Sequence, residues 1–334
     1  MKKKTMALLS AAVMVTAVMA GCSSNKGTET TAPATTAPAA EATTEAPTEA
    51  PEANALTADL VVAGSDGAGL VAAIQAVKDG MDPSKVMIID KKGELGADIA
   101  SMGNTMNASN TDEQYEQEIE DSFESYLADI KKAGNGKNNE VMAEFIAENS
   151  EEALLWLRDV GLELEGVTKG EGASIARSYA ATGDKKLSEA LTEVLLKEVE
   201  TLKIQVLGDT SVEEILFAED GSVSGLKIKG RDGQDTVTCT SLILADKELL
   251  SLLEKETLTF TKDADEKSTG LLVNTCAEVI KEGEETVPGL YAVGGITDAA
   301  LFGEKALAGD PITVTVLLGS TAGTEAAVYV SDNK

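Results

Sequence analysis

The segment Leu60-Val61-Val62-Ala63-Gly64-Ser65-Asp66-Gly67-Ala68-Gly69 is an apolar strand followed by a glycine-rich turn. An apolar helical pattern follows it to Lys78, so the segment predicts the strand, turn and helix of a dinucleotide-binding unit. In the pattern G-x-G-x-x-G, the first glycine makes the turn, the second lets the backbone approach a pyrophosphate, and the third lets the helix pack on the strand. The second position here is Asp66. A carboxylate at that place opposes a pyrophosphate by about 1 to 4 kcal/mol per charge pair at roughly 4 Å.

A shifted register is the alternative for this turn. Gly67-x-Gly69-x-x-Ala72 fits the variant G-x-G-x-x-A, although it starts late after the strand.

Val86-Met87-Ile88-Ile89-Asp90 predicts a second buried strand that ends in an acid. An acid about 20 residues beyond the glycines binds a ribose hydroxyl in dinucleotide-binding folds. We therefore expect Asp90 to face a ribose. The alternative is a parallel α/β unit that carries an acid at a strand end for structural reasons.

The first 22 residues have the pattern of a secretion signal. Three lysines at positions 2 to 4 precede an apolar run over 6–20 that is short for a membrane span. Met19-Ala20-Gly21-Cys22 resembles the lipobox of bacterial lipoproteins, which implies a lipidated Cys22 and an anchor on the outer face of the cytoplasmic membrane, at the bacterial cell surface. An ordinary secretion signal with a chance cysteine is the alternative.

Residues 23–55 predict a disordered stalk. They are mostly Thr, Ala, Pro and Glu, hold four of the seven prolines and almost no large apolar residue, and so cannot bury a core. Residues 56–334 are then expected to form one sizeable domain.

The charge and the residue types exclude several functions. Without the three signal lysines the chain has 25 basic and 57 acidic residues, a net charge of −32, which makes nucleic acid an unsuitable partner. The chain has no histidine, which removes Ser-His and Cys-His nucleophile pairs and His-bearing zinc sites. We predict no metal site. Cys239 and Cys276 either pair or remain as single buried thiols.

The order of helices and strands predicts an α/β fold with an inserted β-meander. Ser150 has the features of a helix N-cap, with the apolar face Leu154, Leu155, Leu157 and Val160 ending at Gly161, and Trp156 is expected in the core. A further amphipathic helix covers 187–202. Strands are expected over 203–207, 211–218, 222–229 and 235–245, and the tail returns as a strand over 289–294 and a helix over 311–329.

Three segments together resemble the flavoprotein subunit of the fumarate reductase and succinate dehydrogenase family, especially its soluble, urocanate reductase-like branch. They are Ala133-Gly134 through Glu148-Asn149-Ser150 and Trp156-Leu157 to Gly161, then 172–177, and Pro288-Gly289-Leu290-Tyr291-Ala292-Val293-Gly294. The resemblance covers 59–330 and implies a Rossmann-like domain that binds FAD, a cap domain, a His and Arg pair that holds substrate, and a cap Arg that donates a proton.

The resemblance also implies cofactor contacts. Near the pyrophosphate, the adenosine, the ribityl chain and the ring it places Gly64, Ser65, Gly67, Ala68, Gly69, Asp90, Ser101, Val212, Gly294, Thr297 and Ile312.

The departures from the family lie at these contacts. Asp66 replaces a glycine, Ala97 and Ile99 replace a glycine and a hydroxyl residue, and Gly295 replaces a glutamate. The turn Ala-Thr-Gly-Gly becomes Ala245-Asp246-Lys247-Glu248, and Ala306 stands at the substrate arginine. Only residues 246–269 lie where the cap is inserted, so we expect the cap to be absent, and we assign no catalytic residue.

These features support two interpretations of the function. The first is a lipid-anchored, extracytoplasmic FAD protein that passes electrons from an open cleft to an unknown partner, as an oxidoreductase without fumarate reductase chemistry. The alternative is a degenerate, non-catalytic binding or interaction module that no longer binds FAD. The sequence alone leaves open whether the chain is an enzyme.

Overall fold

The computed structural model describes residues 56–254, 256–262 and 265–334, which belong to one compact unit. The predicted signal over 1–22, with Cys22, and the predicted stalk over 23–55 lie outside the described residues. No helix within the described part is long and apolar enough to cross a membrane.

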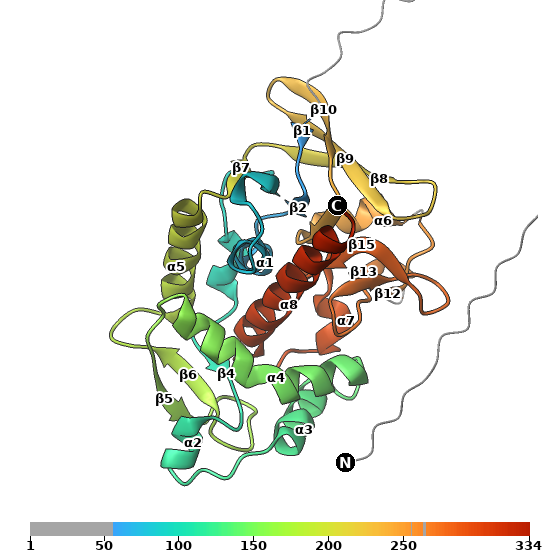
Figure 1. The fold of residues 1–334 in the computed structure, drawn as a ribbon. Helices are drawn as coiled ribbons and strands as arrows, with labels where there is room; N and C mark the ends of the chain where they lie inside the picture. The colour runs from blue at the N-terminus through green and yellow to red at the C-terminus, as the bar shows by residue number, and fades with distance from the viewer. Residues whose placement is uncertain (1–55, 255, 263–264) are drawn as a thin grey trace, which may run out of the picture. The chain divides into compact units, whose positions relative to one another are not determined.

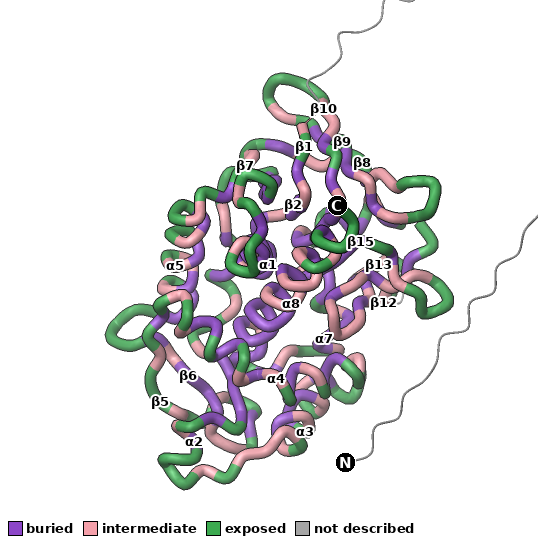
Figure 2. Tube along the Cα trace, in the orientation of Figure 1, coloured by how far each residue is buried: buried purple, intermediate pink, exposed green. Residues whose placement is uncertain are grey.

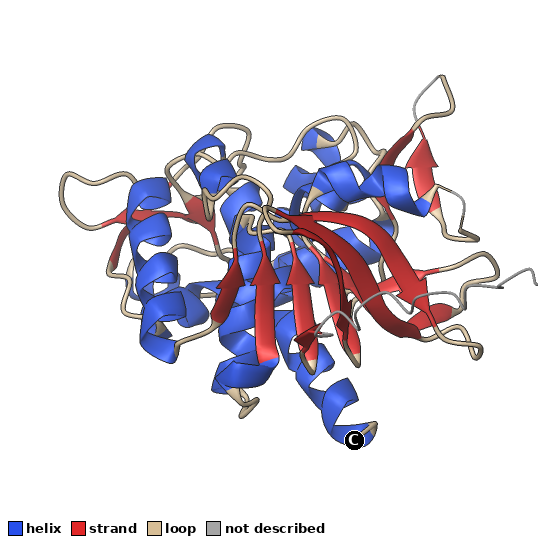
Figure 3. Ribbon diagram, turned by 90° about the horizontal axis from the view of Figure 1, so that it is seen from above, coloured by secondary structure: helices blue, strands red, loops and turns tan. Residues whose placement is uncertain are grey.

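A six-stranded sheet forms the centre of the fold (Figures 1 and 3). Its first strand pairs antiparallel and the other five are parallel, which confirms the predicted α/β class. The order is β14 (Glu278–Ile280), β15 (Thr286–Ala292), β11 (Ser241–Leu244), β2 (Leu60–Ala63), β3 (Val86–Ile89) and β7 (Gln205–Leu207).

The parallel strands end at one edge of this sheet. Ala63 pairs with Ile89 on one side and with Leu244 on the other, and Leu244 pairs with Ala292. The loops that follow β2, β3, β11 and β15 therefore meet along that edge. Ligands bind at such carboxyl edges in open α/β sheets.

Helices α1 (Gly67–Lys78) and α8 (Asp310–Asp332) pack against each other beside the sheet (Figure 1). The packing is close because α8 carries small residues: a Cβ added at Gly319 would lie 2.7 Å from the Ala68 carbonyl oxygen. Both helices are lined with buried residues (Figure 2). Helix α5 (Leu187–Leu202) packs on α1 and confirms the predicted helix over 187–202.

The predicted meander is β8 (Ser211–Phe217), β9 (Val223–Gly230) and β10 (Gly233–Thr238), with β1 (Leu56–Thr57) added parallel to β10. The single strand expected over 235–245 is wrong. The chain leaves the meander at Cys239 and enters the main sheet as β11, and the N–H groups of Thr240 and Ser241 both donate to the Asp59 carbonyl at this crossing.

A lobe between β3 and β7 contains β4 (Met106–Asn107), α2 (Asp112–Glu116), α3 (Phe123–Ala133), α4 (Glu140–Asp159), β5 (Leu164–Thr168) and β6 (Ser178–Ala181). Ser150 is not an N-cap, because α4 begins ten residues earlier with Asn139 as its cap. Ser150 is buried in mid-helix, where its Oγ accepts from the Ser109 N–H. Leu155 is 53% exposed, so its predicted core position is wrong, whereas Trp156 is buried as expected.

The described residues of the segment 246–269 form two short helices and one short strand, and a second strand begins at its end. They are η3 (Lys247–Leu249), α6 (Leu250–Leu253), β12 (Phe260–Lys262) and the start of β13 (Ser268–Leu271). Four further elements complete the order: η1 (Pro83–Lys85), η2 (Ala97–Ser101), η4 (Gly294–Ile296) and α7 (Asp298–Phe302). Cys239 and Cys276 are both free thiols, Cys239 buried and Cys276 half-buried.

Candidate functional site

A cleft of about 760 Å³ lies along the carboxyl edge of the main sheet. Its walls come from the loops after β2, β3, β11 and β15, from η2, from the start of β8 and from α8. The volume falls within the usual range of about 300 to 1,000 Å³ for a small-molecule site. Because β3 and β15 flank the two central strands, the segment Asp90–Glu94 and the Gly294–Gly295 turn border opposite sides of the cleft.

Two carboxylates accept hydrogen bonds from N–H groups at the start of α1, in the middle of this cleft. Asp66 caps the helix, with its Oδ1 accepting from the Gly69 N–H at 2.8 Å. Asp98, in η2, accepts from the Gly67 N–H at 2.9 Å. The N-terminus of a helix favours anions because its first N–H groups have no partner within the helix, and here two side chains of the protein supply the acceptors.

Both carboxyl groups have a pKa above the usual value of an aspartate. Burial raises the pKa of Asp66 well above its usual value, the charge of Asp98 adds to the rise, and the N–H groups of Gly69 and Gly295 oppose it. Burial also raises the pKa of Asp98, against the N–H of Gly67.

Packing within the fold requires the first and third glycines of the motif. A Cβ added at Gly64 would lie 2.7 Å from the Ala245 carbonyl carbon, and one at Gly69 would lie 2.7 Å from the Ala245 Cβ. The second position, which is needed for a close pyrophosphate, is Asp66. The turn therefore keeps the two glycines that the packing of strand and helix requires. It lacks the second glycine, whose role is to let a pyrophosphate approach the backbone.

The side of the cleft after β3 keeps the acid expected near a ribose. Ser65 Oγ donates to Asp90 Oδ1 at 2.5 Å, and the Gly93 N–H donates to Asp90 Oδ2. Asp90 is 5% exposed and lines the cleft. These bonds fix the carboxylate at the end of its strand.

Glu248, Lys91 and Lys92 also line the cleft on the side of Asp90, and they are joined by salt bridges. Glu248 accepts from Lys91 at 2.6 Å and lies 3.2 Å from Lys92 Nζ, which lowers the pKa of Glu248. These two lysines and Lys247 are the basic residues that line the cleft in the part of the chain that the structure describes. Seven acids line it with them: Asp66, Asp90, Glu94, Asp98, Asp246, Glu248 and Asp298. The cleft is therefore net acidic, which is opposite in sign to what a pyrophosphate requires.

The expected cofactor contacts fall into two groups. The cleft is lined by Gly64, Ser65, Asp90, Ser101, Val212 and Gly294. The others lie behind its wall: Gly67, Ala68 and Gly69 are buried in the first turn of α1, Thr297 is buried and donates to the Gly294 carbonyl, and Ile312 is buried in α8.

Among the site residues that the sequence analysis missed are Asp98 and Asp298, whose charges act on Asp66. Asp98 stands between Ala97 and Ile99, two positions that depart from the family, and this neighbourhood is the signal that could have drawn attention to it. Nothing in the sequence connects Asp98 with Gly67, because the contact joins residues 31 positions apart.

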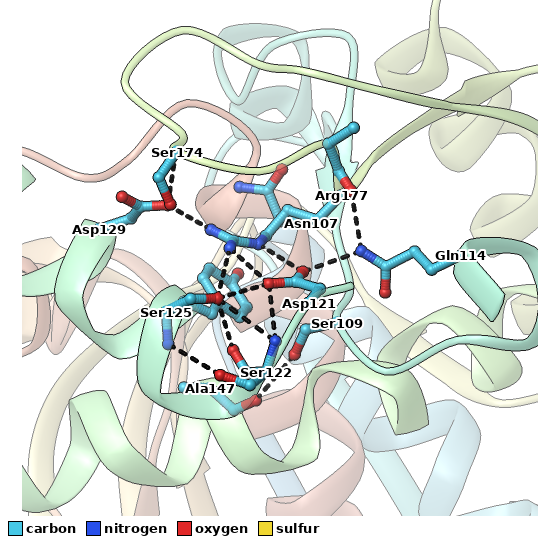
Figure 4. Close-up of polar contacts among 12 residues, drawn as sticks. Asn107, Ser109, Gln114, Asp121, Ser122, Ser125, Asp129, Ala147, Ser174 and Arg177 are labelled. Atoms are coloured by element: carbon cyan, nitrogen blue, oxygen red, sulfur yellow. Dashed lines mark hydrogen bonds and ion pairs between the residues drawn. The ribbon is translucent and has the colours of Figure 1, made fainter. Parts of the chain in front are cut away.

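The arginine of the segment 172–177 is structural. Arg177 is fully buried and makes ion pairs with Asp121 at 2.7 Å and Asp129 at 2.5 Å (Figure 4). Its guanidinium also lies over the Tyr126 ring. It joins α3 to β6 and is not available to a ligand in the cleft.

Comparison with known families matches residues 59–255 to the FAD binding domain. The chain belongs to this family. An NADH:fumarate oxidoreductase of Klebsiella pneumoniae is 37% identical over 170 residues, 51% of this chain and 18% of that protein. A fumarate reductase (cytochrome) of Shewanella frigidimarina is 32% identical over 190 residues, 57% of this chain and 33% of that protein. The chain thus spans a third or less of these relatives.

A solved structure, the open conformation of a flavocytochrome c3 fumarate reductase, has the same fold, with a TM-score of 0.71 at 17% identity over 82% of this chain and 79% of that chain. The predicted membership of the fumarate reductase and succinate dehydrogenase flavoproteins is confirmed, and a urocanate reductase is among the matching proteins. FAD is the cofactor that these matches support.

The cleft fits FAD only in part. The side with Asp90 and Val212 has the acid at a strand end that binds a ribose hydroxyl in dinucleotide-binding folds. The pyrophosphate position does not fit in this arrangement, because Asp66 and Asp98 already hold the N–H groups that would bind the phosphates.

Proposed function

We propose that the chain is a lipid-anchored, extracytoplasmic FAD-binding protein of the fumarate reductase type that exchanges electrons with a partner through an open cleft. The cleft at the carboxyl edge of the sheet, with Asp90 held at the end of β3, is the observation that carries the proposal. Bound FAD would supply one- and two-electron redox chemistry. The residues of the chain would hold the adenosine end and leave the flavin end accessible.

Fumarate reduction is not part of this function. Holding a dicarboxylate dianion needs free basic groups. The basic residues among the described cleft residues are Lys91, Lys92 and Lys247, of which the first two pair with Glu248 and the third interacts with Asp298, and the whole chain has no His. The flanking acids Asp66, Asp98 and Asp298 would repel the dianion.

The test uses the full-length chain purified in mild detergent. We expect FAD to bind in a 1:1 ratio, measured by the flavin absorbance after equilibrium dialysis, and bound flavin to be reduced by dithionite and reoxidised by ferricyanide. Reduced viologen dye should show no turnover with fumarate. Absence of flavin after dialysis against excess FAD refutes the proposal.

Cys22 provides the anchor in this proposal. Cys22→Ser should abolish the incorporation of labelled palmitate and release the protein from the membrane fraction. Protease added to intact spheroplasts should cleave the wild-type chain. Protection from that protease would place the protein on the wrong side of the membrane.

The alternative function is a non-catalytic module that keeps the fold without the cofactor. The two carboxylates on the α1 amides favour it, since they satisfy the phosphate-binding groups without a ligand. The same dialysis experiment separates the two functions, because the module retains no FAD.

A further inference from the structure

The N–H groups that a dinucleotide-binding fold offers to phosphate are hydrogen-bonded within this protein. Asp66 and Asp98, the carboxylate pair, come from different parts of the chain: the turn after β2 and the helix η2. Asp66 accepts from the Gly69 N–H at 2.8 Å and, through its other oxygen, from the Gly295 N–H at 3.3 Å. Asp98 accepts from the Gly67 N–H at 2.9 Å. Three backbone donors from α1 and η4 thus converge on two carboxylates.

We propose that the carboxylate pair is an internal anion that occupies the pyrophosphate subsite, so that a dinucleotide binds only when Asp66 and Asp98 are displaced or protonated. This inference rests on the FAD-binding cleft of the proposed function. It makes the two residues determinants of specificity: they act against ligands with a pyrophosphate and leave the adenosine side of the cleft open.

The backbone around the carboxylate pair leaves room for the Asp66 side chain. A Cβ at Gly294 would overlap the Asp66 carboxylate, so the glycine provides the space in which the aspartate lies. Asp298 in α7 faces the pair and adds negative charge, and Lys247 in η3 interacts with Asp298. Among the described residues no group of three or more His, Cys, Asp or Glu is arranged to hold a metal ion.

The test compares FAD with two uncharged parts of it, adenosine and riboflavin, on full-length protein by equilibrium dialysis. The double variant Asp66→Gly, Asp98→Ala removes both side-chain acceptors, which frees the helix amides, and it restores the glycine of the motif. We expect FAD to bind this variant more tightly by about one to three powers of ten per carboxylate removed, and adenosine and riboflavin affinities to change by less than about threefold.

Asp298→Asn is the matched control. It removes one charge from the same cleft but frees no N–H at α1, so the FAD affinity should rise by only a few-fold. Asp66→Asn and Asp98→Asn serve as single variants that keep side chains of the same size, and thermal melting shows that each variant is folded.

The dependence on pH gives an independent readout. Burial raises the pKa of both carboxyl groups, so both take up protons above the pH range of an exposed Asp. FAD binding to the wild-type chain should therefore strengthen as the pH is lowered through the range in which these two groups take up protons, by up to about tenfold per pH unit for each proton taken up. The double variant should lose most of this slope. Burial also raises the pKa of Asp298, so Asp298→Asn should remove only the smaller part of the slope that its charge contributes.

The outcomes separate this inference from the proposed function. If wild-type protein binds FAD tightly and the double variant gains nothing, the inference is wrong and the function stands. If only the variants bind FAD, the inference is supported and the function fails. If the folded double variant also fails to bind FAD, or if adenosine gains as much as FAD, the carboxylate pair is not the obstacle and the inference is wrong.

Discussion

Asp310→Asn should stabilise the protein at neutral pH. Asp310 is the first residue of α8 and is 1% exposed, and it accepts from Tyr126 Oη at 2.7 Å and Asn107 Nδ2 at 2.8 Å. Burial raises the pKa of Asp310 from 3.8 to about 6 against these two hydrogen bonds. An asparagine keeps an acceptor for both donors and carries no charge.

The sign and the size follow from linkage. Below pH 3.8 the carboxyl is protonated in both states and costs nothing; between pH 3.8 and about 6 only the unfolded state ionises, so stability falls as the pH rises and then stays level. A shift of this size corresponds to about 3 kcal/mol. Losing the favourable interaction of a carboxylate with the helix N-terminus offsets about 0.5 to 1 kcal/mol, which leaves a gain of about 2 kcal/mol at pH 7.

Urea unfolding at pH 4.5 and pH 7.5 measures this effect. The gain from Asp310→Asn should be about 2 kcal/mol larger at pH 7.5 than at pH 4.5. Tyr126→Phe is the matched control: it removes a donor to the carboxylate and should destabilise the protein, more at neutral pH than at acid pH. An Asp310→Asn variant that is less stable than wild type at pH 7.5, or whose effect does not change with pH, would show that the carboxylate is ionised and well stabilised.

Three further predictions concern packing and burial. Gly69→Ala places a Cβ 2.7 Å from the nearest side-chain carbon and should destabilise the protein by about 1 to 3 kcal/mol in urea unfolding, whereas Gly208→Ala, with open space around it, should change stability by less than about 1 kcal/mol. Arg177→Met leaves two buried carboxylates without their partner and should lower the free energy of unfolding by about 3 to 5 kcal/mol; a loss below about 1 kcal/mol would contradict the buried network. Iodoacetamide should alkylate Cys276 before Cys239 in native protein, as read by mass spectrometry, because burial raises the pKa of Cys239 to about 12.

The local signals of the sequence predict the central unit well. The apolar runs over 60–63 and 86–89, joined by the glycine turn and a helix, form as expected, because strand, turn and helix propensities all agree there. The prediction of a single strand over 235–245 is wrong because the local pattern and the tertiary pairing disagree there. Its apolar pattern continues across Cys239 and Thr240, and only the long-range pairing of Ser241 with Leu60 moves the second half into another sheet.

The prediction of an N-cap at Ser150 is wrong because tertiary packing outweighs the local preference of serine for cap positions. Ser150 has the residue type of a cap, but Asn139 accepts from the Met142 N–H and starts the helix earlier. Mid-helix Ser150 instead receives a hydrogen bond from Ser109, 41 positions away. Asp98 was missed for the same physical reason, since both contacts depend on tertiary structure that no local pattern encodes.

The residues of the site differ according to what constrains them. Gly64 and Gly69 stand where an added Cβ would collide with the chain itself. Asp66 stands at the position of the second glycine, where a side chain interferes with a bound phosphate but not with the packing of the fold. Gly294 shows that this replacement is accommodated by the structure, because the space left by its missing side chain now holds the Asp66 carboxylate. A turn built to bind phosphate through its amides therefore binds a carboxylate through the same amides, and the affinity for FAD depends on how easily that carboxylate leaves.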